Sequence, residues 1–73
     1  MDKLLKYLEK NNIKYVRDNS VFPGKYNYLF YKAGFGSFVE FHNLSDAEIS
    51  RKDYQDIIIK KLKKVFASKL HVY

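Results

Sequence analysis

The sequence predicts a small, single-domain α+β protein with the element order α-β-β-β-α, in which both helices cover one face of a three-stranded antiparallel meander. Three observations predict this class. The chain has 73 residues, which suffice for one hydrophobic core. Apolar residues recur at helical spacing near both ends, and they alternate with polar residues in the middle. We therefore expect one α+β domain over residues 1–73.

The first predicted element is a helix over residues 2–11. Leu4, Leu5 and Leu8 share one helical face, and lysines surround the remainder. Asn11 and Asn12 follow, and asparagine tolerates the left-handed backbone conformation that ends many helices. The helix is therefore expected to end at these residues.

Period-two alternation predicts three strands. The first starts at Ile13 and reaches the turn residues 18–20, the second covers residues 26–32 and the third covers residues 35–42. The segment 21–24, Val-Phe-Pro-Gly, predicts a turn between the first two, because proline restricts φ and glycine allows positive φ.

The residues Ala33-Gly34 predict a tight hairpin between the second and third strands. The register that this hairpin implies pairs Phe30 with Ser37 and Tyr28 with Val39. Strand pairing of this kind determines which side chains share a face of the sheet.

The two faces of the predicted sheet differ in composition. The face expected to contact the helices carries Tyr26, Tyr28, Phe30, Phe35, Val39 and Phe41. The opposite face carries Leu29, Tyr31 and Phe38 beside polar residues. A slip by one residue would exchange the two faces.

Two capping-box sequences, at residues 45–48 and 50–53, precede the last helix, and one of them is expected to begin only a single turn. An apolar stripe then follows at helical spacing: Tyr54, Ile57, Ile58, Leu62, Val65 and Phe66, with Ile59 at its edge. We expect Ile58, Leu62 and Phe66 to pack with the first helix onto the apolar face of the sheet.

The charges are segregated along the chain, whose formal net charge is +6. Residues 57–73 contain no acid and five lysines, namely Lys60, Lys61, Lys63, Lys64 and Lys69, whereas residues 40–56 contain five acids against Arg51 and Lys52. A lysine cluster on one helix neutralises phosphates without reading base sequence. The same cluster is also typical of a solvent-exposed helix face, because lysines interact favourably with the negative end of the helix dipole. We predict nucleic-acid binding by these seven basic residues, with DNA and RNA both open.

Tyr31 and Phe38 form a second candidate surface, because bases stack on exposed aromatic rings. Aromatic residues also dominate protein interfaces, and they make up 18% of this chain. The alternative function is therefore a protein-binding inhibitor, such as a phage anti-defence or anti-CRISPR-type protein that blocks a host nuclease, polymerase or ribonucleoprotein. Abundant Lys, Asn, Ile and Tyr are typical of AT-rich genomes, so we expect a phage or mobile-element source.

Catalytic and cofactor sites are not predicted. The absence of cysteine excludes disulfides, thiol catalysis and thiolate zinc sites. Glu40, His42, Asp46 and Glu48 suggest a divalent-cation site, but a surface hydrogen bond between the first two is the favoured interpretation. We expect a non-enzymatic protein without cofactor or metal.

The opening residues carry charge where a signal peptide is apolar, and no apolar run reaches the length of a membrane span. These features predict a cytoplasmic protein with no membrane partner.

The segment 32–41, Lys-Ala-Gly-Phe-Gly-Ser-Phe-Val-Glu-Phe, resembles the octapeptide of RNA-recognition motifs. Two insertions separate it from that pattern, and Ser37 breaks the alternation that would bring Phe35 and Phe38 to one face. A glycine-containing hairpin turn is the favoured interpretation.

The element order is similar to that of double-stranded-RNA-binding domains and of HicA-type RNA-cleaving toxins. The toxins carry Gly-Ser-His after the first strand, whereas residues 17–21 here are Arg-Asp-Asn-Ser-Val. The RNA-binding domains open their last helix with Lys-Lys-x-Ala-Lys, of which residues 50–54, Ser-Arg-Lys-Asp-Tyr, keep two basic residues. The resemblance implies topology and leaves function open.

Overall fold

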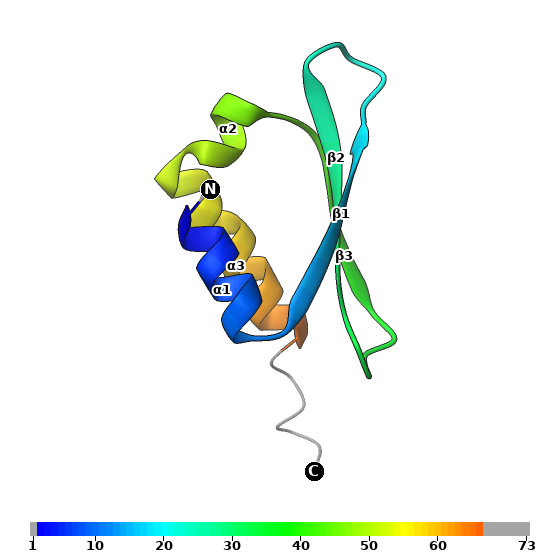
Figure 1. Ribbon diagram of the computed structural model, residues 1–73, viewed down its shortest axis with the longest axis vertical. Helices are drawn as coiled ribbons and strands as arrows, with labels where there is room; N and C mark the ends of the chain where they lie inside the picture. Colours follow the sequence, from blue (N-terminus) through cyan, green and yellow to red (C-terminus); the bar gives the residue numbers. More distant parts are fainter. Residues whose placement is uncertain (1, 67–73) are drawn as a thin grey trace.

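The structure is a computed structural model that describes residues 2–66. Its helices are α1 (Asp2–Lys10), α2 (Asp46–Ser50) and α3 (Lys52–Phe66). Its strands are β1 (Ile13–Asn19), β2 (Lys25–Lys32) and β3 (Phe38–Ser45), which form one antiparallel sheet in the order β1-β2-β3. All helices lie on one face of the sheet (Figure 1), so the predicted α+β class and element order are confirmed.

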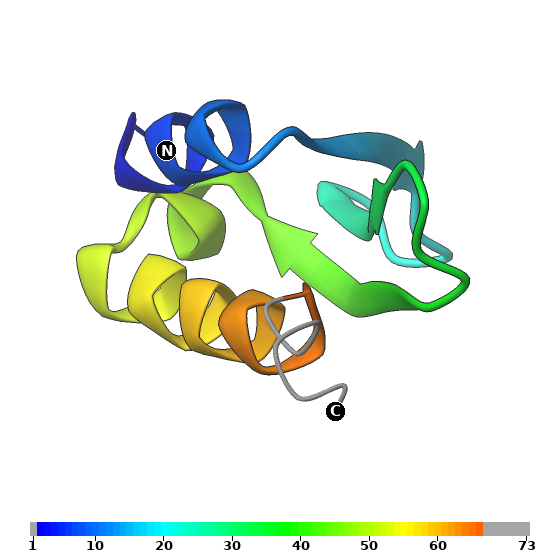
Figure 2. The ribbon, with the colours of Figure 1, turned by 90° about the horizontal axis from the view of Figure 1, so that it is seen from below.

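Helix α1 ends as its two asparagines predict. The side-chain amide of Asn11 donates to the carbonyl of Tyr7 at 2.9 Å, and Asn12 has a φ of 56°. This left-handed residue turns the chain into β1, whose first residue, Ile13, is buried. Seen from below in Figure 2, α1 and α3 lie side by side on the same side of the sheet.

The predicted register between β2 and β3 is wrong by two residues. Phe30 pairs with Val39 and Tyr28 pairs with Phe41, so the connection spans residues 33–37 and is no tight two-residue hairpin. The predicted faces survive, because side chains alternate with a period of two along a strand.

Phe35 explains why the connection is longer. Its ring packs edge-on against Phe66 of α3, with 5.6 Å between the ring centroids. Phe35 therefore packs against the core although it lies in the loop. Phe38 lies on the opposite side of the sheet. The two rings do not share the single face that an RNA-recognition octapeptide requires.

Strand β3 also continues beyond its predicted end at residue 42. A bulge between the pairs Tyr28–Phe41 and Tyr26–Leu44 places one extra residue on β3. Asn43 has a φ of 59°, and its backbone N–H donates to the side chain of Asn27 at 3.0 Å. The bulge returns Leu44 to the buried face.

Of the two capping-box sequences, the first forms. Ser45 and Glu48 exchange both hydrogen bonds, and the short helix α2 begins there. In the second, the carboxylate of Asp53 accepts hydrogen bonds from Arg51 and from the backbone of Tyr54 instead. Arg51 separates α2 from α3 with an extended backbone.

The core lies between the helices and the inner face of the sheet. Its buried apolar members are Leu4, Leu8, Ile13, Tyr28, Phe30, Val39, Leu44, Ile49, Ile58, Ile59, Leu62 and Phe66. The expected packing of α1 and α3 onto the sheet is therefore confirmed. Ile57 is an exception, because three successive isoleucines cannot all point inward from a helix, and its side chain is 57% exposed.

Gln55 takes a core position that the apolar pattern left unassigned. Its side-chain oxygen accepts the backbone N–H of Leu4 at 2.9 Å, and its amide donates to the carbonyl of Ser50 at 3.0 Å. The side chain therefore ties the first turn of α1 to the end of α2.

Candidate nucleic-acid interface

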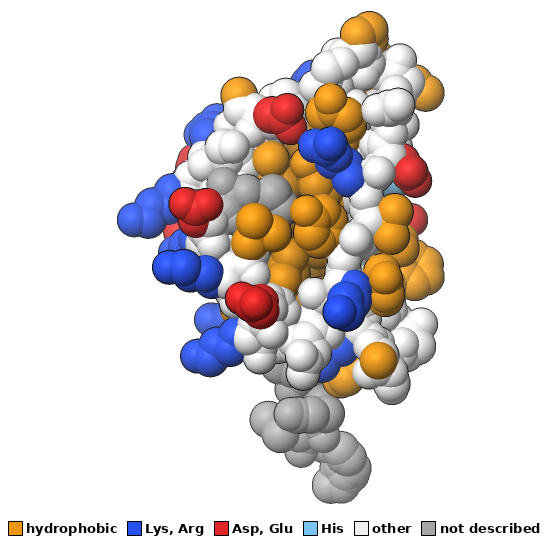
Figure 3. Space-filling model, viewed as in Figure 1, with side chains coloured by type: hydrophobic (Ala, Val, Ile, Leu, Met, Phe, Trp, Pro, Cys, Tyr) orange, Lys and Arg blue, Asp and Glu red, His pale blue; other side chains and the backbone are white. Residues whose placement is uncertain are grey.

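Four lysines occupy the outer side of the second half of α3: Lys60, Lys61, Lys63 and Lys64. All four are exposed, because the opposite side of the helix carries the buried residues that contact the sheet. We call these four residues the lysine face. In the space-filling view, basic side chains lie along the outer flank of the helical layer, with acidic side chains among them (Figure 3).

The lysine face has no acidic partner within residues 2–66, whereas the neighbouring acids are paired. The acids of residues 46–56 form four ion pairs, Asp46 with Arg17, Glu48 with Lys25, Asp53 with Arg51 and Asp56 with Lys3. The four lysines of the lysine face therefore form one unpaired cluster at the C-terminal end of α3, within the part of the chain that the structure describes.

Arg51 and Lys52 stand apart from the lysine face. The guanidinium of Arg51 binds both oxygens of Asp53, with its shortest contact at 2.7 Å, and these hydrogen bonds hold the pKa of Asp53 below its ordinary value. Lys52 lies eight residues before Lys60, which is roughly 12 Å along the helix axis. Lys69 lies outside the described residues.

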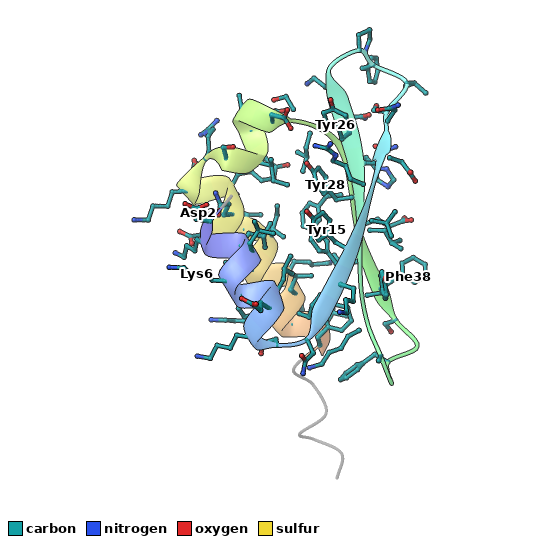
Figure 4. The ribbon with its side chains drawn as sticks, viewed as in Figure 1. Asp2, Lys6, Tyr15, Tyr26, Tyr28 and Phe38 are labelled. Atoms are coloured by element: carbon teal, nitrogen blue, oxygen red, sulfur yellow. The ribbon has the colours of Figure 1, made fainter. Side chains whose placement is uncertain are left out.

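Lysines of α1 extend the basic surface, and the sequence analysis did not select them. Lys3, Lys6 and Lys10 are three and four residues apart, so they lie on one side of α1. The ammonium of Lys3 pairs with Asp56, which places this side next to α3. Lys6 points away from the sheet (Figure 4). The helical spacing of these lysines was the signal that would have identified them.

The second predicted surface lies on the outer face of the sheet. Tyr31 and Phe38 are paired across β2 and β3, and they are 41% and 57% exposed. Lys14 is the partner of Tyr31 on β1, so one row across the sheet carries a cation and two rings. In Figure 4, Phe38 lies on the side of the sheet away from the helices.

The two predicted surfaces do not form a single site. The lysine face lies on the side of α3 opposite its buried residues, and Tyr31 and Phe38 are cross-strand partners on the outer face of the sheet. One short strand of nucleic acid therefore cannot contact both at once without passing around the edge of the molecule.

The residues considered for a divalent cation are separated in the structure. The imidazole Nε2 of His42 lies 3.6 Å from the carboxylate of Glu40 on the outer face of β3. Asp46 and Glu48 are held in the ion pairs described above. Residues 2–66 contain no group of three or more side chains placed to hold a metal ion.

Comparison with protein-family models, curated proteins and solved structures finds no match to this chain. Within residues 2–66, the helices are too short or too polar to cross a membrane.

Proposed function

We propose that this protein binds nucleic acid through the phosphate backbone, without sequence preference, and that the lysine face makes the contacts. The observation that carries the proposal is the set of four exposed lysines that lack acidic partners within residues 2–66. Each lysine that neutralises a phosphate releases a condensed counterion, which favours binding at low salt.

The position of the lysines on a helix supports this function. The buried residues of α3 pack the helix against the sheet, so the four lysines extend from a helix that is part of the core. Lysine side chains provide mobile point charges and no fixed pattern of hydrogen bonds, and this chemistry suits phosphates better than base edges.

The experiment is fluorescence anisotropy with labelled single-stranded and double-stranded oligonucleotides of unrelated sequences. The wild-type protein is expected to bind all of them, and its affinity on double-stranded DNA should fall with salt by a log–log slope of about −0.9 per phosphate contacted. The double variant Lys60→Glu/Lys64→Glu should lose at least about 90% of the affinity at low salt, because each reversal removes an attraction and adds a repulsion.

A matched variant distinguishes an effect of the lysine face on affinity from an effect of the net charge of the protein. Lys14→Glu/Lys32→Glu changes the net charge by the same amount but alters β1 and β2. It should retain most of the affinity. If it weakens binding as much as Lys60→Glu/Lys64→Glu, or if the wild type does not bind at low salt, the proposed function is wrong.

A second candidate function is supported by the exposed aromatic row. Tyr31 and Phe38 lie beside Leu29 and Val16 on the outer face, and such a surface suits a protein partner. This inhibitor function predicts that Tyr31→Ala/Phe38→Ala loses a protein partner while nucleic-acid affinity is unchanged. If the rings instead stack bases, the same variant weakens single-strand binding and leaves the salt slope intact.

A further inference from the structure

Strand β1 has one unpaired edge. It pairs with β2 on one side only, and all of its side chains except Ile13 are exposed. α1 contacts β1 from the helical side of the sheet, as α2 and α3 contact β3, and the edge of β1 itself has no neighbouring strand within residues 2–66 (Figure 1). An edge of this kind presents backbone N–H and C=O groups that can pair with another strand.

The hydrogen bonds to β2 determine which residues of β1 face this free edge. The backbone N–H of Ser20 donates to the carbonyl of Lys25 at 3.0 Å, in continuation of the β1–β2 register. Backbone groups point alternately to the two sides of a strand. Val16 therefore directs its backbone groups to β2, and Tyr15 and Arg17 direct theirs to the free edge.

We propose that two copies of this chain associate through β1, antiparallel, about a two-fold axis at Val16. In this register Tyr15 of each copy exchanges both backbone hydrogen bonds with Arg17 of the second copy, and Val16 faces Val16. Lys14 of each copy lies opposite Asp18 of the other. The result is one continuous sheet with three strands from each copy.

Charge complementarity supports this register. Within residues 2–66, neither Lys14 nor Asp18 has an ion-pair partner, although both lie on the outer face of the sheet. The two-fold axis brings them together twice, once on each side of Val16. Opposite charges directly across two strands are stabilising, and like charges there are destabilising.

Other two-fold registers are less favourable. An axis at Arg17 sets Arg17 against its own copy, and an axis at Lys14 sets two lysines together. An axis at Tyr15 places Lys14 opposite Val16 and leaves the charge without a partner. An axis through a peptide bond sets a residue that faces the free edge against one whose backbone groups already bind β2.

Exposed apolar side chains on this side of the molecule give the contact a hydrophobic component. Val16 is 44% exposed, Tyr15 is 38% exposed and Leu5 of α1 is 42% exposed. Tyr15 and Leu5 line the same open hollow between β1 and α1. Figure 3 shows apolar side chains uncovered between the helical layer and the sheet on this side, where a second copy would cover them.

The test is a charge exchange within β1, followed by sedimentation equilibrium of the full chain from micromolar to millimolar concentration. The wild type is expected to show a monomer–dimer equilibrium. Lys14→Asp and Asp18→Lys should each raise the dissociation constant by about tenfold, because each creates two like-charge pairs. The double variant Lys14→Asp/Asp18→Lys should restore the wild-type constant. Lys6→Asp, on the outer side of α1, is the control and should leave it unchanged.

Mixing the two single variants gives the sharpest result. Their opposite charges meet at both positions, so they should form a heterodimer more readily than either forms a homodimer. Circular dichroism confirms that each variant is folded. A wild type that stays monomeric overturns the proposal. A dimer that is insensitive to both single variants, or a mixture without heterodimer, does so too, because the contact would then lie elsewhere.

Discussion

The two faces of α3 differ in how much of the fold depends on them. The inner face carries Ile58, Ile59, Leu62 and Phe66, all buried against the sheet and α1. The outer face of the same turns carries the lysine face, whose ammonium groups contact no acid within residues 2–66. Stability and the proposed binding are therefore assigned to opposite sides of one helix, and substitutions can separate them.

The strongest test of this separation is Leu62→Ala. Leu62 is fully buried, so its truncation removes transfer free energy and leaves a cavity. The free energy of unfolding should fall by about 2–5 kcal/mol, which is a large part of the stability of a domain of this size. Urea denaturation measures the change. A loss below about 1 kcal/mol would contradict the central position of Leu62 in the core.

A smaller loss is expected from the polar member of the inner face. Gln55→Ala leaves the buried backbone N–H of Leu4 without its acceptor and the carbonyl of Ser50 without its donor. The free energy of unfolding should fall by about 1–3 kcal/mol. If thermal and urea denaturation show no change, the link between α1 and α2 contributes little.

The carboxylates near the start of α3 predict a pH dependence of stability. The hydrogen bonds with Ser45 lower the pKa of Glu48, and the hydrogen bond from Arg51 lowers the pKa of Asp53. Each group therefore stabilises the fold at pH values above its ordinary pKa, and this contribution is lost as the pH falls through the lowered value.

Thermal unfolding followed from neutral pH to below pH 4 measures this loss, with ordinary pKa values of 4.5 for Glu48 and 3.8 for Asp53. Glu48→Gln and Asp53→Asn should each flatten the acid limb of the curve. If the acid limb of both variants is as steep as that of the wild type, other carboxylates cause the acid sensitivity.

The smallest effect on stability is expected on the outer face. Lys64→Ala should change the free energy of unfolding by no more than about 0.5 kcal/mol, because its ammonium group has no acidic partner within residues 2–66. If Lys64 contacts a phosphate of double-stranded DNA, the same variant should reduce the salt slope by about 0.9. A destabilised Lys64→Ala protein would show that the two faces of α3 are not independent.

Periodicity in the sequence was sufficient to predict the fold class, the element order and the residues on each face of the sheet. The alternation of residues 26–32 assigns Tyr28 and Phe30 to one side whatever their cross-strand partners are, because side chains alternate strictly along a strand. For the same reason Tyr31 and Phe38 were placed on the outer face correctly, although the register was wrong by two residues.

Contacts between distant segments decided the rest. The connection after β2 is long because Phe35 docks on Phe66, and local turn chemistry contains no information about that ring. Ile57 is exposed because the buried arc of α3 is centred on its neighbours, and Gln55 is buried because α1 offers it a donor.

The distribution of charge was likewise determined in part by the sequence and in part by the tertiary structure. The sequence alone determined that the lysines of α3 are clustered on a helix and lie opposite an apolar stripe, since both follow from helical spacing. Only the tertiary structure decided which charges are neutralised, because the pairs Lys3–Asp56, Arg17–Asp46 and Lys25–Glu48 join residues far apart in the chain. Coulomb attraction acts through distance in space, and that distance is set by the packing of α1, α2 and the sheet.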